Sequence, residues 1–137
     1  MAQSTADLMD GRARATLWID SGAACVVGAT FLLFREPLAA LLGFPSALVL
    51  LIGVANLTYA SYSGSLALLA ARGSTLPRRA VDLLIGANLT WVAVCLALLV
   101  LTWREASVLG LAQVALEALF VGALALRERR LVRPFTR

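Results

Sequence analysis

The chain has 137 residues, 61% of them hydrophobic, and a formal net charge of +4 at pH 7. Soluble domains are about 45–50% apolar, and the mean hydropathy here is +0.86, which argues against a water-soluble bundle. The length is too short for two domains. The positive charge does not form a basic face with groups that read bases, so nucleic acid is not an expected partner.

Four apolar runs fill most of the chain, at about 13–34, 46–71, 80–103 and 106–126. A bilayer core of about 30 Å needs about 20 helical residues to span it, and lipid offers no partner to a bare backbone amide. Segments such as Ala93–Leu101 are apolar all round, unlike the two-faced helices of soluble bundles. The sequence predicts an all-α integral membrane protein, a four-transmembrane-helix bundle that forms one domain over residues 1–137.

The first run follows a polar start and is longer than the apolar stretch of a signal peptide, so no cleavable signal is expected. Trp18 lies near its beginning, and Phe31 and Phe34 near its end, as suits the two membrane interfaces. Residues 37–45 are too few to cross the bilayer and lie between two prolines. This segment is predicted to form a short helix that lies flat on the outer surface of the membrane.

The arginines predict the orientation of the bundle. All of them except Arg35 and Arg104 lie at the start of the first run, between the second and third, or after the fourth. By the positive-inside rule both termini and the middle loop are cytoplasmic. The exclusive use of Arg over Lys suggests a GC-rich bacterial genome, and the expected location is the bacterial inner membrane, with the lipid bilayer as the main partner.

Polar residues are concentrated in the second run, over residues 56–65. Asn56, Tyr59 and Ser63 share one helical face, and Tyr62 lies on the neighbouring face with Thr58 and Ser65. Two interpretations remain open. The polar groups join helices closely, as small and hydroxylated residues do in membranes, or they line a ligand cavity.

The only two asparagines, Asn56 and Asn88, each begin the motif Asn-Leu-Thr-aromatic after an alanine. In the third run Asn88, Trp91 and Cys95 follow the same helical spacing. Trp91 is near mid-depth rather than at an interface. It is either an ordinary core tryptophan or the wall of an aromatic pocket shared with Tyr59 or Tyr62.

Glu117 is the most informative single residue, because it lies midway through the fourth run with Gln113 one turn earlier on the same face. An acidic side chain at that depth is costly and often functional. No Lys or Arg lies within the runs at that depth, so uncharged neighbours or a ligand must stabilise it. Asp20, in the first run, is the second proton or charge candidate, with pairing to Arg12, Arg14 or Arg79 as the alternative.

The leading functional hypothesis is a polar and aromatic intramembrane pocket that binds, and as a further option transports, a small amphipathic or cationic ligand. The predicted ligand-binding residues are Asn56, Tyr59, Tyr62, Asn88, Trp91, Gln113 and Glu117. A homodimer is expected, since four helices usually need a second copy to enclose a path. The alternative is an accessory or assembly subunit of a larger membrane complex.

A membrane enzyme acting on lipid or quinone is the third alternative. The chain has no His, no nucleophile–base pair and no phosphate-binding loop, and Cys25 and Cys95 do not form a CxxC pair. We therefore expect no catalytic residues, no metal and no cofactor.

Overall fold

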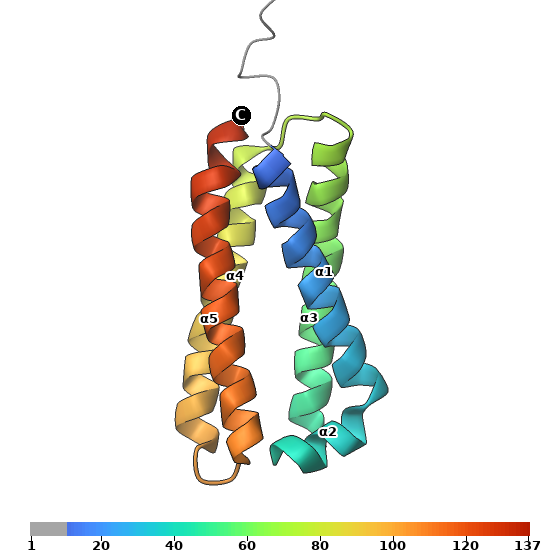
Figure 1. The fold of residues 1–137 in the computed structure, drawn as a ribbon, viewed down its shortest axis with the longest axis vertical. Coiled ribbons are helices and arrows are strands. Elements are labelled where there is room, and N and C mark those ends of the chain that lie inside the picture. Colours follow the sequence, from blue (N-terminus) through green and yellow to red (C-terminus); the bar gives the residue numbers. More distant parts are fainter. Residues whose placement is uncertain (1–10) are drawn as a thin grey trace, which may run out of the picture.

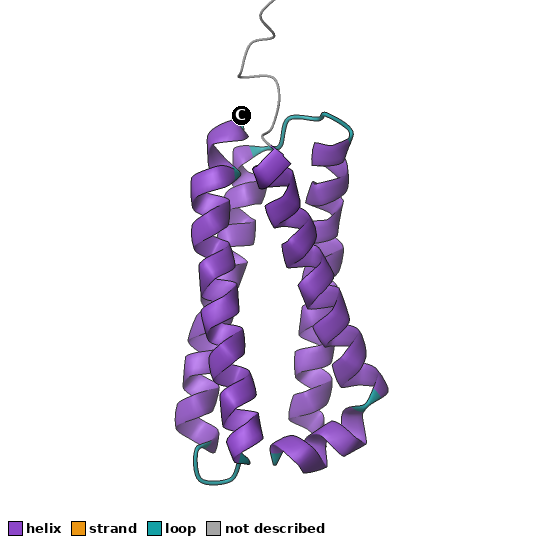
Figure 2. Cartoon of the chain, in the orientation of Figure 1, coloured by secondary structure: helices purple, strands orange, loops and turns teal. Residues whose placement is uncertain are grey.

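The computed structural model describes residues 11–137, which form helices joined by short loops (Figures 1 and 2). Four of the helices are long and apolar enough to cross a membrane. The elements in chain order are α1 (Gly11–Leu33), α2 (Arg35–Leu42), α3 (Ser46–Ala71), α4 (Arg78–Thr102), α5 (Val108–Leu131) and the 3₁₀ turn η1 (Arg133–Phe135).

The long helices are arranged as two antiparallel pairs (Figure 1). Helix α1 packs along α3, and α4 packs along α5, whereas α1 and α5 share a smaller contact and α3 and α4 barely touch. Each pair is therefore a closely packed unit, and the space between the pairs is available for polar side chains.

Small residues allow the close approach of α1 and α3. A Cβ atom added at Gly28 would lie 2.9 Å from the backbone nitrogen of Leu57 and 3.0 Å from the carbonyl oxygen of Gly53. Near this contact, the Ser21 hydroxyl donates a hydrogen bond of 3.1 Å to the carbonyl of Ala60. Lipid chains are as apolar as Leu side chains, so contacts of this kind, rather than water exclusion, hold membrane helices together.

Helix α2 lies between α1 and α3 in the chain, crosses one end of the bundle and contacts both pairs. It is capped by Gly43, whose φ of 68° is in the left-handed region that favours glycine. The carbonyl of Leu42 then accepts a 2.9 Å hydrogen bond from the amide of Ser107, and the Ser107 hydroxyl caps α5 by accepting from the amide of Gly110. Glu36, at the start of α2, accepts a hydrogen bond from the Ser46 hydroxyl and forms an ion pair with Arg35. These contacts hold the pKa of Glu36 below its usual range.

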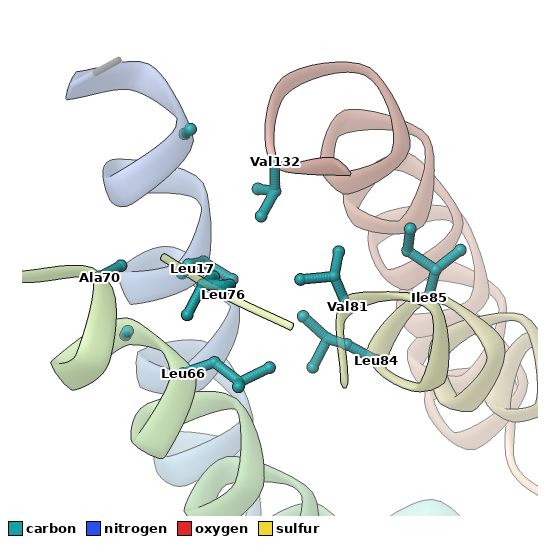
Figure 3. Close-up of a cluster of buried hydrophobic side chains, with 10 residues drawn as sticks. Leu17, Leu66, Ala70, Leu76, Val81, Leu84, Ile85 and Val132 are labelled. Atoms are coloured by element: carbon teal, nitrogen blue, oxygen red, sulfur yellow. The ribbon is translucent and has the colours of Figure 1, made fainter. Parts of the chain in front are cut away.

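An apolar cluster closes the opposite end, where α1 and α4 begin and α3 and α5 end (Figure 3). Its buried members come from α1, α3, α4, the loop before α4 and the residue that follows α5, and include Leu17, Leu66, Leu76, Leu84 and Val132. The chain terminus is attached here, since the amide of Arg137 donates to the carbonyl of Leu76 and the amide of Arg78 donates to the carbonyl of Arg137.

The structure confirms the predicted all-helical bundle with four long apolar helices. The helix bounds differ by a few residues from the predicted runs, most of all in α5, which continues to Leu131 rather than ending near residue 126. The last turns of α5 carry Arg127, Arg129 and Arg130 on exposed positions, where long side chains can reach water. A short helix was predicted over residues 37–45, and the structure has a short helix there, α2, which starts at Arg35 and ends at Leu42.

Candidate functional site

A cavity of about 560 Å³ lies between the two helix pairs. All four long helices contribute to its wall. The polar or aromatic lining residues are Asp20, Asn56, Tyr59, Asn88, Thr90, Trp91, Glu117 and Phe120, and the remaining ones are small or aliphatic. The apolar cluster around Leu17 and Leu84 lies toward one end of the bundle, and a second cluster around Phe31, Ile52 and Val114 lies toward the other. The cavity is therefore at an intermediate depth.

Glu117 is held in this cavity by uncharged donors. The indole Nε1 of Trp91 donates to Oε1 at 2.7 Å, and the amide nitrogen of Gln113 donates to Oε2 at 2.6 Å. The amide nitrogen of Asn56 is 3.5 Å from Oε1, which makes this a long and weak contact. Helices α3, α4 and α5 thus all supply a donor to one carboxylate, as the sequence argument required.

A second polar cluster joins all four long helices, nearer the arginine-rich end. The Tyr59 hydroxyl of α3 donates to Asp20 of α1 at 2.6 Å. The Asn88 amide of α4 donates to Glu128 of α5 at 3.0 Å. The two hydrogen bonds thus link α1 to α3 and α4 to α5, and each of them ends on a buried acid. Asp20 is 2% exposed and Glu128 is fully buried, so the two acids are enclosed by protein.

Glu128 is the functional candidate that sequence reasoning missed, because it lies among arginines and was assigned to the chain after the fourth run. A signal was present in its spacing. It follows Glu117 by eleven residues (128 − 117), which is close to three turns of 3.6 residues and places both acids on one face of α5. One oxygen of Glu128, Oε1, has no hydrogen-bond partner within the described residues, and neither does the buried hydroxyl of Ser63.

The structure brings five of the predicted ligand-binding residues to the cavity wall: Asn56, Tyr59, Asn88, Trp91 and Glu117. Gln113 does not line the cavity, but its side-chain amide donates a hydrogen bond to Glu117. Tyr62 points elsewhere, and its hydroxyl donates to the carbonyl of Ala80 at 2.9 Å, which bridges α3 and the start of α4. The two asparagines of the repeated motif do not meet. Each approaches a different glutamate of α5.

The predicted polar sector of the second run is divided between two environments. Thr58, Ser61 and Ser65 are exposed, and each hydroxyl donates to the carbonyl four residues earlier on its own helix. Such hydroxyls need no partner from another helix and are compatible with a lipid-facing surface. The inward face keeps Asn56 and Tyr59 for the cavity.

The cavity acids have no cationic partner within residues 11–137. The ion pairs of this part of the chain join Arg35 to Glu36, and Arg78 and Arg133 to Asp82. Asp20, the acid for which arginine pairing was the alternative, instead accepts from Tyr59. Both thiols are free, with Cys25 exposed on α1 and Cys95 buried on α4, and no metal-binding group of three or more His, Cys, Asp or Glu occurs in the described residues.

The cavity reaches the outer surface of the bundle sideways. Several of its lining residues are also exposed, among them Gly86 and Thr90 of α4 and Phe120 of α5. Helices α3 and α4, which belong to different pairs, make little contact with each other, and this leaves room for an opening between them. The cavity is therefore open to the side of the bundle, at a depth between the two apolar clusters.

Replacing Asn88 with Leu is expected to destabilise the bundle by about 1–3 kcal/mol, because buried Glu128 loses its amide donor. The measurement is unfolding in mixed micelles, followed by circular dichroism as the fraction of denaturing detergent rises. Thr90→Val is the matched control, since the Thr90 hydroxyl bonds only its own helix at Gly86. Equal stability of the two variants would show that the Asn88–Glu128 contact contributes little.

Comparison of the chain with protein-family models, curated proteins and solved structures gives no match.

Proposed function

We propose that this protein is a multi-pass membrane protein that binds a small amphipathic cation in the cavity between its helix pairs. The observation that carries the proposal is Glu117, a carboxylate that faces a cavity of about 560 Å³ and is held only by neutral donors. Ligand pockets of about 300–1,000 Å³ with mostly apolar walls and a few polar groups are typical of small-molecule sites.

The charge of the ligand follows from the acids. Asp20 and Glu117 both line the cavity, and no guanidinium within residues 11–137 neutralises either of them. A cation between them gains two attractive interactions in a medium of low dielectric constant, where such interactions are strong. The rings of Trp91, Tyr59 and Phe120 add faces that attract an ammonium group, and aromatic walls of this kind are common in sites for quaternary ammonium ligands.

The amphipathic character follows from the walls and the route of entry. Most of the lining surface is apolar, with Val27, Leu83, Val121 and Leu124 among the residues that provide it, so a ligand needs an apolar body beside its charge. The sideways opening beside α4 faces lipid when the helices span a bilayer. We infer that the ligand enters from the membrane rather than from water, and that transport is an extension of this binding and not a requirement for it.

The proposed setting is a bacterial inner membrane with both termini in the cytoplasm. All arginines except Arg35 and Arg104 lie near the end of the bundle that holds the start of α1 and the end of α5; Figure 1 shows these two helix ends. Reporter domains fused to the C-terminus test this orientation, and activity of a periplasmic reporter there would contradict it. The cavity is built within one chain, so ligand binding as proposed does not depend on the homodimer that the sequence suggested.

The test compares phenyltrimethylammonium with tert-butylbenzene, a neutral molecule of nearly the same shape. The protein carries Trp18→Phe and Trp103→Phe, so that Trp91 alone reports binding through its fluorescence. We expect the ammonium to bind more tightly than the neutral compound. Glu117→Gln should weaken ammonium binding about tenfold or more, because a buried charge interaction contributes at least about 1.5 kcal/mol.

The matched control is Glu105→Gln, which removes one negative charge from an exposed loop outside the cavity. It should leave the affinity for the ammonium unchanged. Equal binding of the charged and neutral compounds to the unsubstituted protein would reject a cation site. A stoichiometric larger partner retained through purification in mild detergent, with no binding of either compound, would instead favour the alternative of an accessory subunit.

A further inference from the structure

A groove follows the outer seam between α4 and α5 at the arginine-rich end of the bundle. It consists of two adjoining hollows, one of about 240 Å³ and one of about 380 Å³. Arg129 and Arg133 line both hollows, which makes them parts of one surface, called here the α4/α5 groove. It lies outside the cavity described above, with which it shares no lining residue.

The spacing of residues on the two helices explains how the groove is graded from charged to apolar. On α4, Arg78, Asp82, Ile85 and Leu89 follow one another at intervals that keep them on one face. They span eleven residues (89 − 78), or about 16 Å at 1.5 Å per residue. The antiparallel side of the groove runs from Arg133 at the start of η1 to Arg129, Leu126 and Ala125 on α5. The arginines are at the end of the bundle, and the apolar residues are nearer its middle.

The charged end has unused positive charge. Asp82 forms ion pairs with Arg133, at 2.8 Å, and with Arg78, at 3.8 Å, so it orients two of the guanidinium groups. Arg129 has no carboxylate within ion-pair distance among residues 11–137. Three arginines and one aspartate leave a net charge of +2 (3 − 1) in the groove. An anion with several acceptor oxygens complements this arrangement, since guanidinium groups bind phosphate with two parallel hydrogen bonds.

The apolar end decides between a free anion and a lipid. Leu89 is 52% exposed and Leu126 is 54% exposed, and together with Ile85 they extend the groove away from the arginines. Inorganic phosphate would leave this part bare. An acyl chain beneath a phosphate headgroup would cover it, and in a bilayer the headgroup and chain have the same order along the membrane normal as the arginines and leucines.

We propose that the α4/α5 groove is a specific binding site for an anionic phospholipid. Arg129 and Arg133 bind the headgroup phosphate, Asp82 holds Arg133 in place for it, and one acyl chain lies along Ile85, Leu89 and Leu126. The proposal does not depend on the ligand of the inner cavity.

The test is electron paramagnetic resonance of spin-labelled lipid in phosphatidylcholine bilayers that contain the protein. The label is attached in turn to phosphatidylglycerol and to phosphatidylcholine, and the motionally restricted fraction of each gives the preference for the anionic lipid. We expect a clear preference for phosphatidylglycerol. Arg129→Gln should reduce this preference about fivefold, the effect of one arginine near a charged lipid surface.

Arg130→Gln is the matched control, because it removes the same charge from the next residue of α5, which is exposed but does not line the groove. It should leave most of the preference in place. Equal losses in the two variants would reject a defined site in favour of a diffuse basic surface. Displacement of the labelled lipid when phosphate replaces chloride at the same ionic strength would assign the groove to a free phosphate. Arg129 is exposed, so its substitution should not affect folding.

Discussion

Replacing Gly28 with Ala is expected to lower the free energy of unfolding by about 1–3 kcal/mol, the usual cost of adding a methyl group to a tightly packed contact. The new Cβ would meet the backbone of Leu57 and Gly53 at 2.9 and 3.0 Å, and backbone atoms cannot move aside as a flexible side chain can. Helices α1 and α3 must then separate. The measurement is unfolding in mixed micelles, followed by circular dichroism.

Gly22→Ala is the control for this prediction. It adds the same methyl group to the same helix, two turns earlier, where no atom of a neighbouring element lies within 4 Å of the new Cβ. We expect no loss of stability there, and a small gain, because Ala favours a helix over Gly. If the two variants were equally stable, the α1/α3 contact would be looser than described, and the two-pair arrangement would lose its main support.

Replacing Glu117 with Leu is expected to destabilise the protein by about 2–4 kcal/mol, since it removes the shared acceptor of two strong hydrogen bonds. The indole N–H of Trp91 and the amide of Gln113 would be left facing an aliphatic side chain. On a simple hydrophobicity argument, the same change should stabilise a membrane helix, because insertion of an acidic residue is unfavourable. Loss of the hydrogen bonds thus predicts a less stable variant, whereas hydrophobicity alone predicts a more stable one.

The comparison variants for Glu117→Leu are Glu117→Gln and Glu105→Leu. The first keeps an amide oxygen that can accept one of the two hydrogen bonds, so its stability should lie between those of the leucine variant and the unsubstituted protein. The second removes an exposed loop carboxylate and should change stability by less than about 0.5 kcal/mol. A more stable Glu117→Leu variant would show that the carboxylate is held at a net cost and that its neighbours do not compensate for it.

The helices were predictable from the sequence because a lipid environment leaves few choices. Runs as apolar as Ala93–Leu101 can satisfy their backbone groups in lipid only as helices, and the arginines lie near the ends of the long helices. The two-pair arrangement was not predictable. It depends on close contacts such as that of Gly28 with Leu57, and a lone glycine in a run of small residues does not indicate which helix it will meet.

The central acid of the candidate site was also predictable, and its neighbours were partly so. Glu117 and Gln113 share a face by spacing alone, and the need for uncharged donors followed from the absence of a cation at that depth. Tyr59 and Tyr62 could not be distinguished, because they lie on adjoining faces whose orientation is set by packing. One reaches Asp20 and the other a backbone carbonyl.

Glu128 was missed for a physical reason. In the sequence it is surrounded by Arg127, Arg129 and Arg130, which indicate a water-exposed segment. The arginines occupy only the exposed part of the helix surface, however, and Glu128 lies on the buried face that is turned toward the bundle. The regular spacing from Glu117 to Glu128 is the pattern that identifies it, and it should be examined wherever charged residues extend an apolar helix.

The most direct test of the account is to locate a bound cation. Crystals grown with (4-bromophenyl)trimethylammonium provide a bromine atom, whose anomalous scattering marks the position of the ligand independently of the protein density. We expect a bromine peak inside the cavity between the helix pairs, with the ammonium group beside Glu117 and the ring of Trp91. A peak confined to the outer surface of the bundle, or an empty cavity at saturating ligand, would contradict it.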